Sequence, residues 1–204
     1  MDFRVQRYAV GKLATNCYFL VNNDTKEVVV IDPGYNGDYL SEQIDTNGYK
    51  LQAILITHGH FDHIMAVNYL KEKYCCKVYI HEEEDIILDD AVRTFHVERV
   101  VPDIHLKDGQ VINLAGFDIK VINTPGHSIG CVCYYIEDIK VLFSGDTLFY
   151  GSVGRTDFPT GSTAQMLDSL NNILMKLPYD VEVYPGHGQS TSIGTERMEN
   201  PYIR

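Results

Sequence analysis

Histidine and aspartate side chains are concentrated in one short stretch, Thr57-His58-Gly59-His60-Phe61-Asp62-His63. It follows an apolar segment, 53–56, that is typical of a buried strand. Imidazole nitrogens and carboxylate oxygens are ligands that zinc, iron and manganese accept in proteins. Such a cluster at the end of a strand predicts a metal site at the edge of a sheet. It also predicts hydrolysis by a hydroxide that the metal generates.

Three later segments carry residues of the same types after apolar runs: Thr124-Pro125-Gly126-His127, Ser144-Gly145-Asp146 and Pro185-Gly186-His187. Glycine before histidine allows a tight turn and a close approach of the backbone. Since residues two apart in an extended loop project to one side, we expect His58 and His60 to bind one metal together. Asp62 and His63 would then face a neighbouring position. The whole set predicts a two-metal site with Asp146 between the metals.

The elements that must position these residues follow from the apolar pattern. We expect strands at 2–10, 16–22, 27–32, 52–56, 78–80, 110–114, 117–123, 131–136, 140–144 and 181–184. Helices are expected at 38–47, 64–73 and 162–176, and the acidic run 82–85 is interpreted as the solvated N-terminal turn of another helix. Each half mixes strands with helices, which predicts an α/β (α+β) fold, a four-layer αββα sandwich of two mixed sheets flanked by helices.

Length and composition limit the classes of function. The 204 residues, 45% hydrophobic and 22% charged, fit one globular domain, residues 1–204. A formal charge of −11 argues against nucleic acid as a partner. No stretch approaches the roughly 20 apolar residues of a membrane helix, and the N-terminus has no signal core. We therefore expect no membrane partner. The odd set of five cysteines has no C-x-x-C pair, so we expect reduced thiols and a cytoplasmic location.

The pattern H-x-H-x-D-H, with the later His, Asp and His, resembles the metallo-β-lactamase-fold hydrolases over essentially the whole chain. Within that superfamily the chain looks most like the glyoxalase II group, the hydroxyacylglutathione hydrolases, and especially their short bacterial relatives. The segments that carry this resemblance are Thr15–Tyr18, Ile31–Gly34, His58–His63, Thr124–Ser128, Ser144–Phe149, Gly154–Pro159 and Tyr184–Gly188.

The resemblance implies roles for individual residues. The first metal would be bound by His58, His60 and His127, and the second by Asp62, His63 and His187, with Asp146 bridging. Asp32 would steady a ligand histidine, the alternative being a structural turn before Pro33. Arg155 is a candidate substrate contact, the alternative being a surface ion pair. Two divalent metals are expected, zinc first, with iron or manganese also compatible with these ligands.

The implied reaction is hydrolysis of a small-molecule thioester of the S-lactoylglutathione type. Asp62 and Asp146 would hold the hydroxide that attacks the carbonyl. Full glyoxalase II enzymes continue into a C-terminal helical region that binds glutathione, and this chain stops at Arg204, about where that region would begin. We therefore expect a single domain without it. The sequence does not indicate an oligomeric state.

Three alternatives share parts of this pattern. Persulfide dioxygenases have a segment like 154–158 and hold one iron with the equivalents of His58, His127 and Asp146. A lactone or ester hydrolase of the same fold would share every metal ligand. A metal-stabilised binding module without turnover is the alternative from a different class.

Overall fold

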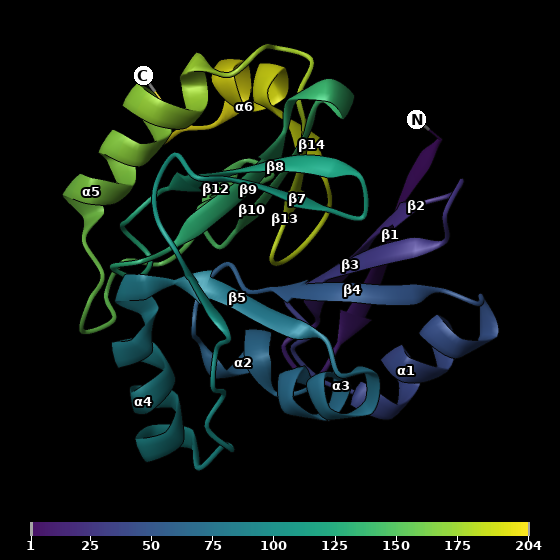
Figure 1. Cartoon of the computed structure of the whole chain (residues 1–204). Coiled ribbons are helices and arrows are strands. Elements are labelled where there is room, and N and C mark those ends of the chain that lie inside the picture. Colours follow the sequence, from purple (N-terminus) through teal and green to yellow (C-terminus); the bar gives the residue numbers. More distant parts are fainter. Residues whose placement is uncertain (1, 204) are drawn as a thin grey trace.

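The computed structural model describes residues 2–203 and contains two six-stranded sheets (Figure 1). The first sheet has its strands in the order β1 to β6: β1 (Phe3–Val10), β2 (Thr15–Asn22), β3 (Glu27–Ile31), β4 (Lys50–Leu55), β5 (Lys77–His81) and β6 (Ile104–Leu106). Strands β1 to β3 pair antiparallel and β3 to β6 pair parallel, so this sheet is mixed.

The second sheet is also mixed and follows the order β14-β13-β10-β9-β8-β7. Its strands are β7 (Val111–Leu114), β8 (Phe117–Asn123), β9 (Val132–Ile136), β10 (Val141–Gly145), β13 (Glu182–Pro185) and β14 (Thr191–Ser192). Only the pair β10 and β13 is parallel within it. Two short strands, β11 (Leu148–Phe149) and β12 (Ser152–Val153), form a separate hairpin.

Parallel strands need crossover connections, and in the first sheet these are helices on one face. They are α1 (Gly37–Thr46), α2 (Phe61–Ile64), α3 (Val67–Tyr74) and, after a 3-10 turn at Glu82–Glu84, α4 (Asp85–Phe95). Two helices, α5 (Thr163–Asp168) and α6 (Ile193–Glu199), cover the outer face of the second sheet (Figure 1). The predicted four-layer αββα sandwich is therefore confirmed.

Three hydrophobic clusters correspond to the three interfaces between these four layers. The strand β3 shows how one element serves two of them. Val28 and Val30 pack toward the helices of the first sheet, whereas Val29 and Ile31 pack into the layer between the sheets. Since alternate side chains of a strand point to opposite faces, this continuous apolar run belongs to a strand that is buried on both sides, as predicted.

Some elements differ from the sequence expectation. The helix expected at 64–73 corresponds to α3, which begins only at Val67, and a separate turn, α2, precedes it. The two are interrupted at Ala66, whose N–H donates to the Pro33 carbonyl at 2.9 Å. The helix expected at 162–176 changes at Ser169 into a π-helical turn, Ser169–Ile173, and then a 3-10 turn, Leu174–Lys176. The short elements β6, β11, β12, β14 and α6 were not predicted, since two to seven residues carry little periodicity.

Strand direction brings the candidate residues to one edge of the sandwich. Strands β3, β4 and β5 are parallel, so their carboxyl ends meet there. Strands β8, β10 and β13 also run in one direction and end on the same side. Contacts between the sheets hold the two edges together, for example the bond from the Val132 N–H to the Thr57 carbonyl at 3.0 Å.

No helix within residues 2–203 combines the length and the apolar character that crossing a bilayer requires. All five cysteines are free thiols in the structure, and Cys131 and Cys133 are buried.

Candidate metal centre

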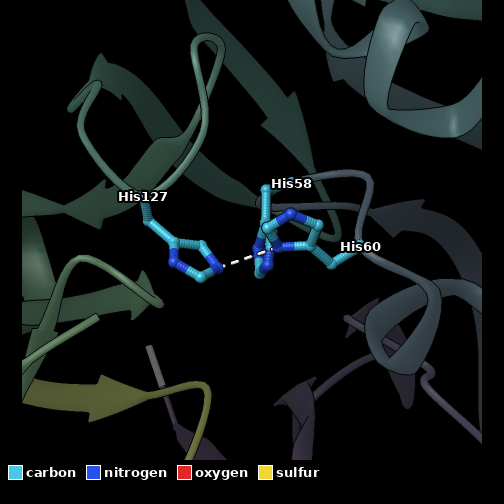
Figure 2. Close-up of side chains that lie close together, drawn as sticks. All are labelled: His58, His60 and His127. Atoms are coloured by element: carbon cyan, nitrogen blue, oxygen red, sulfur yellow. Dashed lines mark hydrogen bonds between the residues drawn. The ribbon is translucent and has the colours of Figure 1, made fainter. Parts of the chain in front are cut away.

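Three histidine rings from two loops converge at the edge of the sandwich (Figure 2). His58 and His60 lie on the loop after β4, and His127 lies on the loop between β8 and β9. The facing nitrogens of His60 and His127, Nδ1 and Nε2, are 2.8 Å apart. The ring centroids of the three histidines lie 4.6–4.8 Å from one another. This first histidine group has the size and composition to hold one metal ion.

A second group lies beside the first and is formed by Asp62, His63 and His187. Asp62 and His63 belong to the single turn of α2, while His187 follows the end of β13. The Oδ2 atom of Asp62 lies 3.3 Å from His187 Nε2 and 3.6 Å from His63 Nε2. The hydroxyl of Thr15 donates to the same oxygen at 2.9 Å, which orients the carboxylate.

Asp146, at the end of β10, lies between the two groups. Its Oδ2 atom is 3.5 Å from Nε2 of His127 in the first group and 3.6 Å from Nε2 of His187 in the second. Gly186 makes this approach possible, because a side chain at that position would overlap the Asp146 carboxylate and the His63 ring. The expected close approach of the Pro-Gly-His backbone is thus present at Gly186.

Asp32 connects the two groups from behind, through three hydrogen bonds. It accepts bonds from the Thr57 N–H at 2.7 Å and the Thr57 hydroxyl at 2.6 Å, and from Nδ1 of His63 at 2.9 Å. The Thr57 hydroxyl in turn lies 3.1 Å from Nδ1 of His58. One buried carboxylate therefore orients a histidine of each group. The φ of 50° at Asp32 is a strained conformation for a residue other than glycine, and such strain often occurs at functional sites.

The remaining atoms of these side chains fit a metal. His63 uses Nδ1 for Asp32, and His127 donates from Nδ1 to the carbonyl of Arg155 at 2.8 Å, so Nε2 of each ring stays available. Within residues 2–203, the Nε2 atoms of His58 and His63 and the Oδ1 atom of Asp146 are buried without a hydrogen-bond partner. Buried polar atoms are normally satisfied, so three such atoms at one site fit a place where cations would bind.

The electrostatic environment agrees with this interpretation. Burial lowers the pKa of His60 to about 3, and it also holds the pKa of His58 well below the usual range, so both rings are neutral ligands. Burial opposes a charge on His63, yet the carboxylates of Asp146 and Asp32 raise its pKa to about 10. The field that favours a proton there would equally favour a metal cation.

A cleft with a volume of about 870 Å³ opens onto the two groups. His60, Asp62, His127, Asp146 and His187 all contribute to its floor. Its walls are largely apolar and aromatic, and they include Ile87, Phe95, Phe149 and Phe158. Such a cleft, with a few converging polar groups, is typical of a small-molecule site.

Arg155 lies at the wall of this cleft and is held in place by its neighbours. Its guanidinium bonds Asp157 at 2.6 and 2.7 Å and lies 4.4 Å from the centre of the Phe158 ring. The ion pair considered from the sequence is therefore present. The side chain lines the cleft and is about 61% exposed, and its contact with substrate stays a prediction.

One residue near the site was misjudged from the sequence. We expected the acidic run 82–85 to be solvated, but Glu84 is completely buried. Its carboxylate bonds the loops that carry His58 and His127 rather than water. A charge run has the same appearance in the sequence whether its members face water or protein, so the pattern could not reveal this position.

The structure thus brings together all seven residues predicted as metal ligands, with Asp32 behind them and Arg155 at the cleft wall. Asp32, His58 and His63 also lie close enough together to form a third possible set of metal ligands. Because its oxygens are already used by Thr57 and His63, we interpret it as a support for the ligands.

Comparison with known protein sequences gives relatives along nearly the full chain. "Probable metallo-hydrolase YqgX" of Bacillus subtilis (strain 168) is 37% identical over 206 residues, covering 97% of this chain and 96% of the relative. "Hydroxyacylglutathione hydrolase GloC" of Haemophilus influenzae (strain ATCC 51907 / DSM 11121 / KW20 / Rd) is 33% identical and covers 92% of both chains.

Solved structures agree with this relationship. The BLEG-1 B3 metallo-beta-lactamase is 36% identical with a TM-score of 0.92, covering 98% of this chain and 99% of the other. TTHA1623 in a di-iron-bound form is 35% identical with a TM-score of 0.87, covering 97% and 100%. ETHE1 from Myxococcus xanthus is 28% identical with a TM-score of 0.83, covering 98% and 84%.

The family model of the metallo-beta-lactamase superfamily matches residues 10–187, which include every residue of the two candidate ligand groups. This match spans most of the chain and agrees with the two mixed sheets, the flanking helices and the metal-binding edge. The chain therefore belongs to the metallo-β-lactamase superfamily and has the fold of its metal-dependent hydrolases.

Proposed function

We propose that this protein hydrolyses small-molecule thioesters of the S-lactoylglutathione type with two divalent metal ions, of which zinc is the first candidate. The observation that carries the proposal is the position of Asp146 between two groups of ligands at the floor of one cleft. The first metal would be held by His58, His60 and His127, the second by Asp62, His63 and His187. The similarity to a hydroxyacylglutathione hydrolase supports the choice of substrate class.

The side chains of the site have distinct tasks in this reaction. When bound, the metals supply a hydroxide nucleophile at neutral pH and polarise the thioester carbonyl. Asp62, oriented by the Thr15 hydroxyl, and Asp146 would flank this hydroxide, and one of them would accept its hydrogen bond and so orient it toward the carbonyl carbon. A thiolate is a good leaving group, so the reaction needs no strong general acid. The aromatic walls at Phe149 and Phe158 exclude water from the reacting carbonyl.

The cleft accommodates a substrate with an extended thiol carrier. Arg155 and Arg93 of α4 both line the cleft, and each lies beside an aspartate, Asp157 and Asp90, in a protein whose net charge is −11. We propose that they attract an anionic carrier such as a peptide thiol. The partner is thus a small molecule rather than nucleic acid or a membrane, and a cytoplasmic location would supply reduced thiols.

The proposal is tested by thiol release from S-lactoylglutathione, with protein stripped of metal and reconstituted with zinc. We expect turnover that disappears when a chelator is added. Absence of turnover in protein that carries two zinc ions would reject this substrate class. A β-lactam should then be tested as substrate, in view of the similarity to a B3 metallo-beta-lactamase.

A second candidate function is supported by a specific similarity. The structure of ETHE1 aligns over nearly the whole chain, and the segment Gly154–Phe158 resembles that of persulfide dioxygenases. In that case one iron would be held by His58, His127 and Asp146. Oxygen uptake with glutathione persulfide by the iron-loaded protein would support this alternative, whereas hydrolysis of the thioester by the zinc form would not.

A further inference from the structure

We infer that Glu84 is a positioning residue that holds the two loops of the first histidine group in register and thereby sets the metal affinity of that group. The inference rests on the proposed role of His58, His60 and His127 as ligands. It concerns a residue outside the site itself, on the 3-10 turn between β5 and α4.

The carboxylate of Glu84 bonds both loops at once. One oxygen, Oε2, accepts the N–H of Gly59 at 2.6 Å. The other, Oε1, accepts the Ser128 hydroxyl at 2.7 Å and the N–H of Gly130 at 2.8 Å. Gly59 lies between the two histidines of the first loop, and Ser128 directly follows His127 of the second. A shift of this carboxylate would therefore move ligands of both loops.

The backbone around Glu84 leaves little space for adjustment. A side chain at Gly59 would lie 3.1 Å from the N atom of Leu88 and 3.3 Å from the carbonyl of Glu84. A side chain at Gly130 would lie 3.0 Å from both the N and the Cγ atoms of Glu84. The first turns of the 3-10 segment and α4 thus pack directly against both loops. His81 anchors the same turn by accepting the N–H of Glu83 at 3.4 Å.

The chemistry of Glu84 favours a positioning role over a simple contribution to packing. Its side chain is fully buried, and its hydrogen-bond partners among residues 2–203 are three neutral donors rather than a lysine or arginine. Burial raises the pKa of this carboxyl to about 6, although the three donors oppose the shift. A buried charge without a counter-ion is costly, so packing alone does not account for a carboxylate at this position. Only a group with two acceptor oxygens can bind both loops.

The test compares zinc binding in Glu84→Gln with that in the unaltered protein. The amide replaces one acceptor oxygen by a donor that faces an N–H or O–H group, so one loop is released while side-chain volume is kept. Zinc affinity is measured by competition with a chelator in two backgrounds. The His187→Ala variant removes a ligand of the second group and keeps the first group intact. The His127→Ala variant removes a ligand of the first group and keeps the second intact.

In the His187→Ala background we expect Glu84→Gln to weaken zinc binding by roughly 10- to 100-fold, the range typical for residues that support metal ligands. In the His127→Ala background we expect unchanged affinity. The matched control is Glu83→Gln, since that neighbouring side chain is half exposed. Thermal unfolding of the metal-free proteins is recorded in parallel.

Unchanged zinc affinity in both backgrounds would overturn the inference. So would an equal loss in both, because a merely structural role would weaken the two groups alike. If Glu84→Gln does not fold, Ser128→Ala removes a single donor and should still weaken the first group selectively by a few-fold, and equal affinity there would contradict us. These readouts do not involve the substrate, so they stand apart from the thioester assay.

Discussion

At the scale of single residues, three of the five histidines of the site are held by a contact at the Nδ1 atom. His63 is oriented by Asp32, His127 by the Arg155 carbonyl and His58 by Thr57. Each of these contacts fixes one ring nitrogen and leaves Nε2 toward the common centre. This arrangement raises the basicity of the ligand and reduces the reorganisation that metal binding requires.

Asp32→Asn should lower zinc affinity or kcat by roughly 10- to 100-fold, because the amide cannot accept all three hydrogen bonds that Thr57 and His63 donate. Chelator competition and steady-state kinetics measure the two effects. The matched control is Asp38→Asn on the exposed surface of α1. Wild-type affinity together with wild-type kcat in Asp32→Asn would show that this carboxylate serves only the turn before Pro33.

His58→Ala and Asp146→Ala should each lose metal and activity together, since His58 belongs to the first group and Asp146 lies between both. Zinc content after dialysis and thiol release measure this directly. His105→Ala, an exposed histidine paired with Asp85, serves as the control and should retain both. Full activity in a variant that has lost its metal would reject the mechanism.

At the scale of elements, the site depends on strands that end at one edge and on glycines that let their ends approach. Gly186 is the position where this matters most, because a side chain there would overlap Asp146. The two sheets contribute different ligands, and contacts such as that of Val132 with Thr57 hold their edges in register. The candidate ligands are therefore positioned by the ends of paired strands from both sheets.

Gly186→Ala should reduce zinc affinity by roughly ten-fold or more, because overpacking of a tight site costs about 1–3 kcal/mol. Gly188→Ala is the matched control. That glycine has a φ of 79° but open space around it, so alanine should cost some stability and leave zinc binding intact. Calorimetric zinc titrations measure the affinity of both variants. Similar affinities would contradict this prediction, because they would mean that the end of β13 shifts to accommodate the added methyl group without weakening zinc binding.

Much of this arrangement could be predicted from the sequence, for physical reasons. Continuous apolar runs such as 28–31 mark buried strands, and metal-binding residue types directly after such runs indicate a shared sheet edge. Glu84 could not be predicted, because two of its three partners are backbone N–H groups, at Gly59 and Gly130, and such groups carry no sequence signal. The break between α2 and α3 was hidden for the same reason, since it depends on a bond to the Pro33 carbonyl.

At the scale of the whole molecule, α4 and the segment after β12 both line the cleft that opens onto the two groups of ligands. Truncation of the side chain in Arg155→Ala leaves its carbonyl free to hold His127. We expect KM for an anionic thioester to rise about two- to five-fold, as for an exposed charge, with little change in kcat. Arg99→Ala, whose guanidinium pairs with Asp89, is the control. An unchanged KM would assign Arg155 to its ion pair alone.

The central claim is that two metals at one site carry out the hydrolysis. Its most direct test is a titration of metal-free protein with zinc, in which bound zinc per chain and the rate of thiol release from S-lactoylglutathione are measured on the same samples. Our account predicts that activity rises until two zinc ions are bound per chain and then stays constant. A rate that is complete at one metal per chain, or no thiol release with both sites filled, would contradict it.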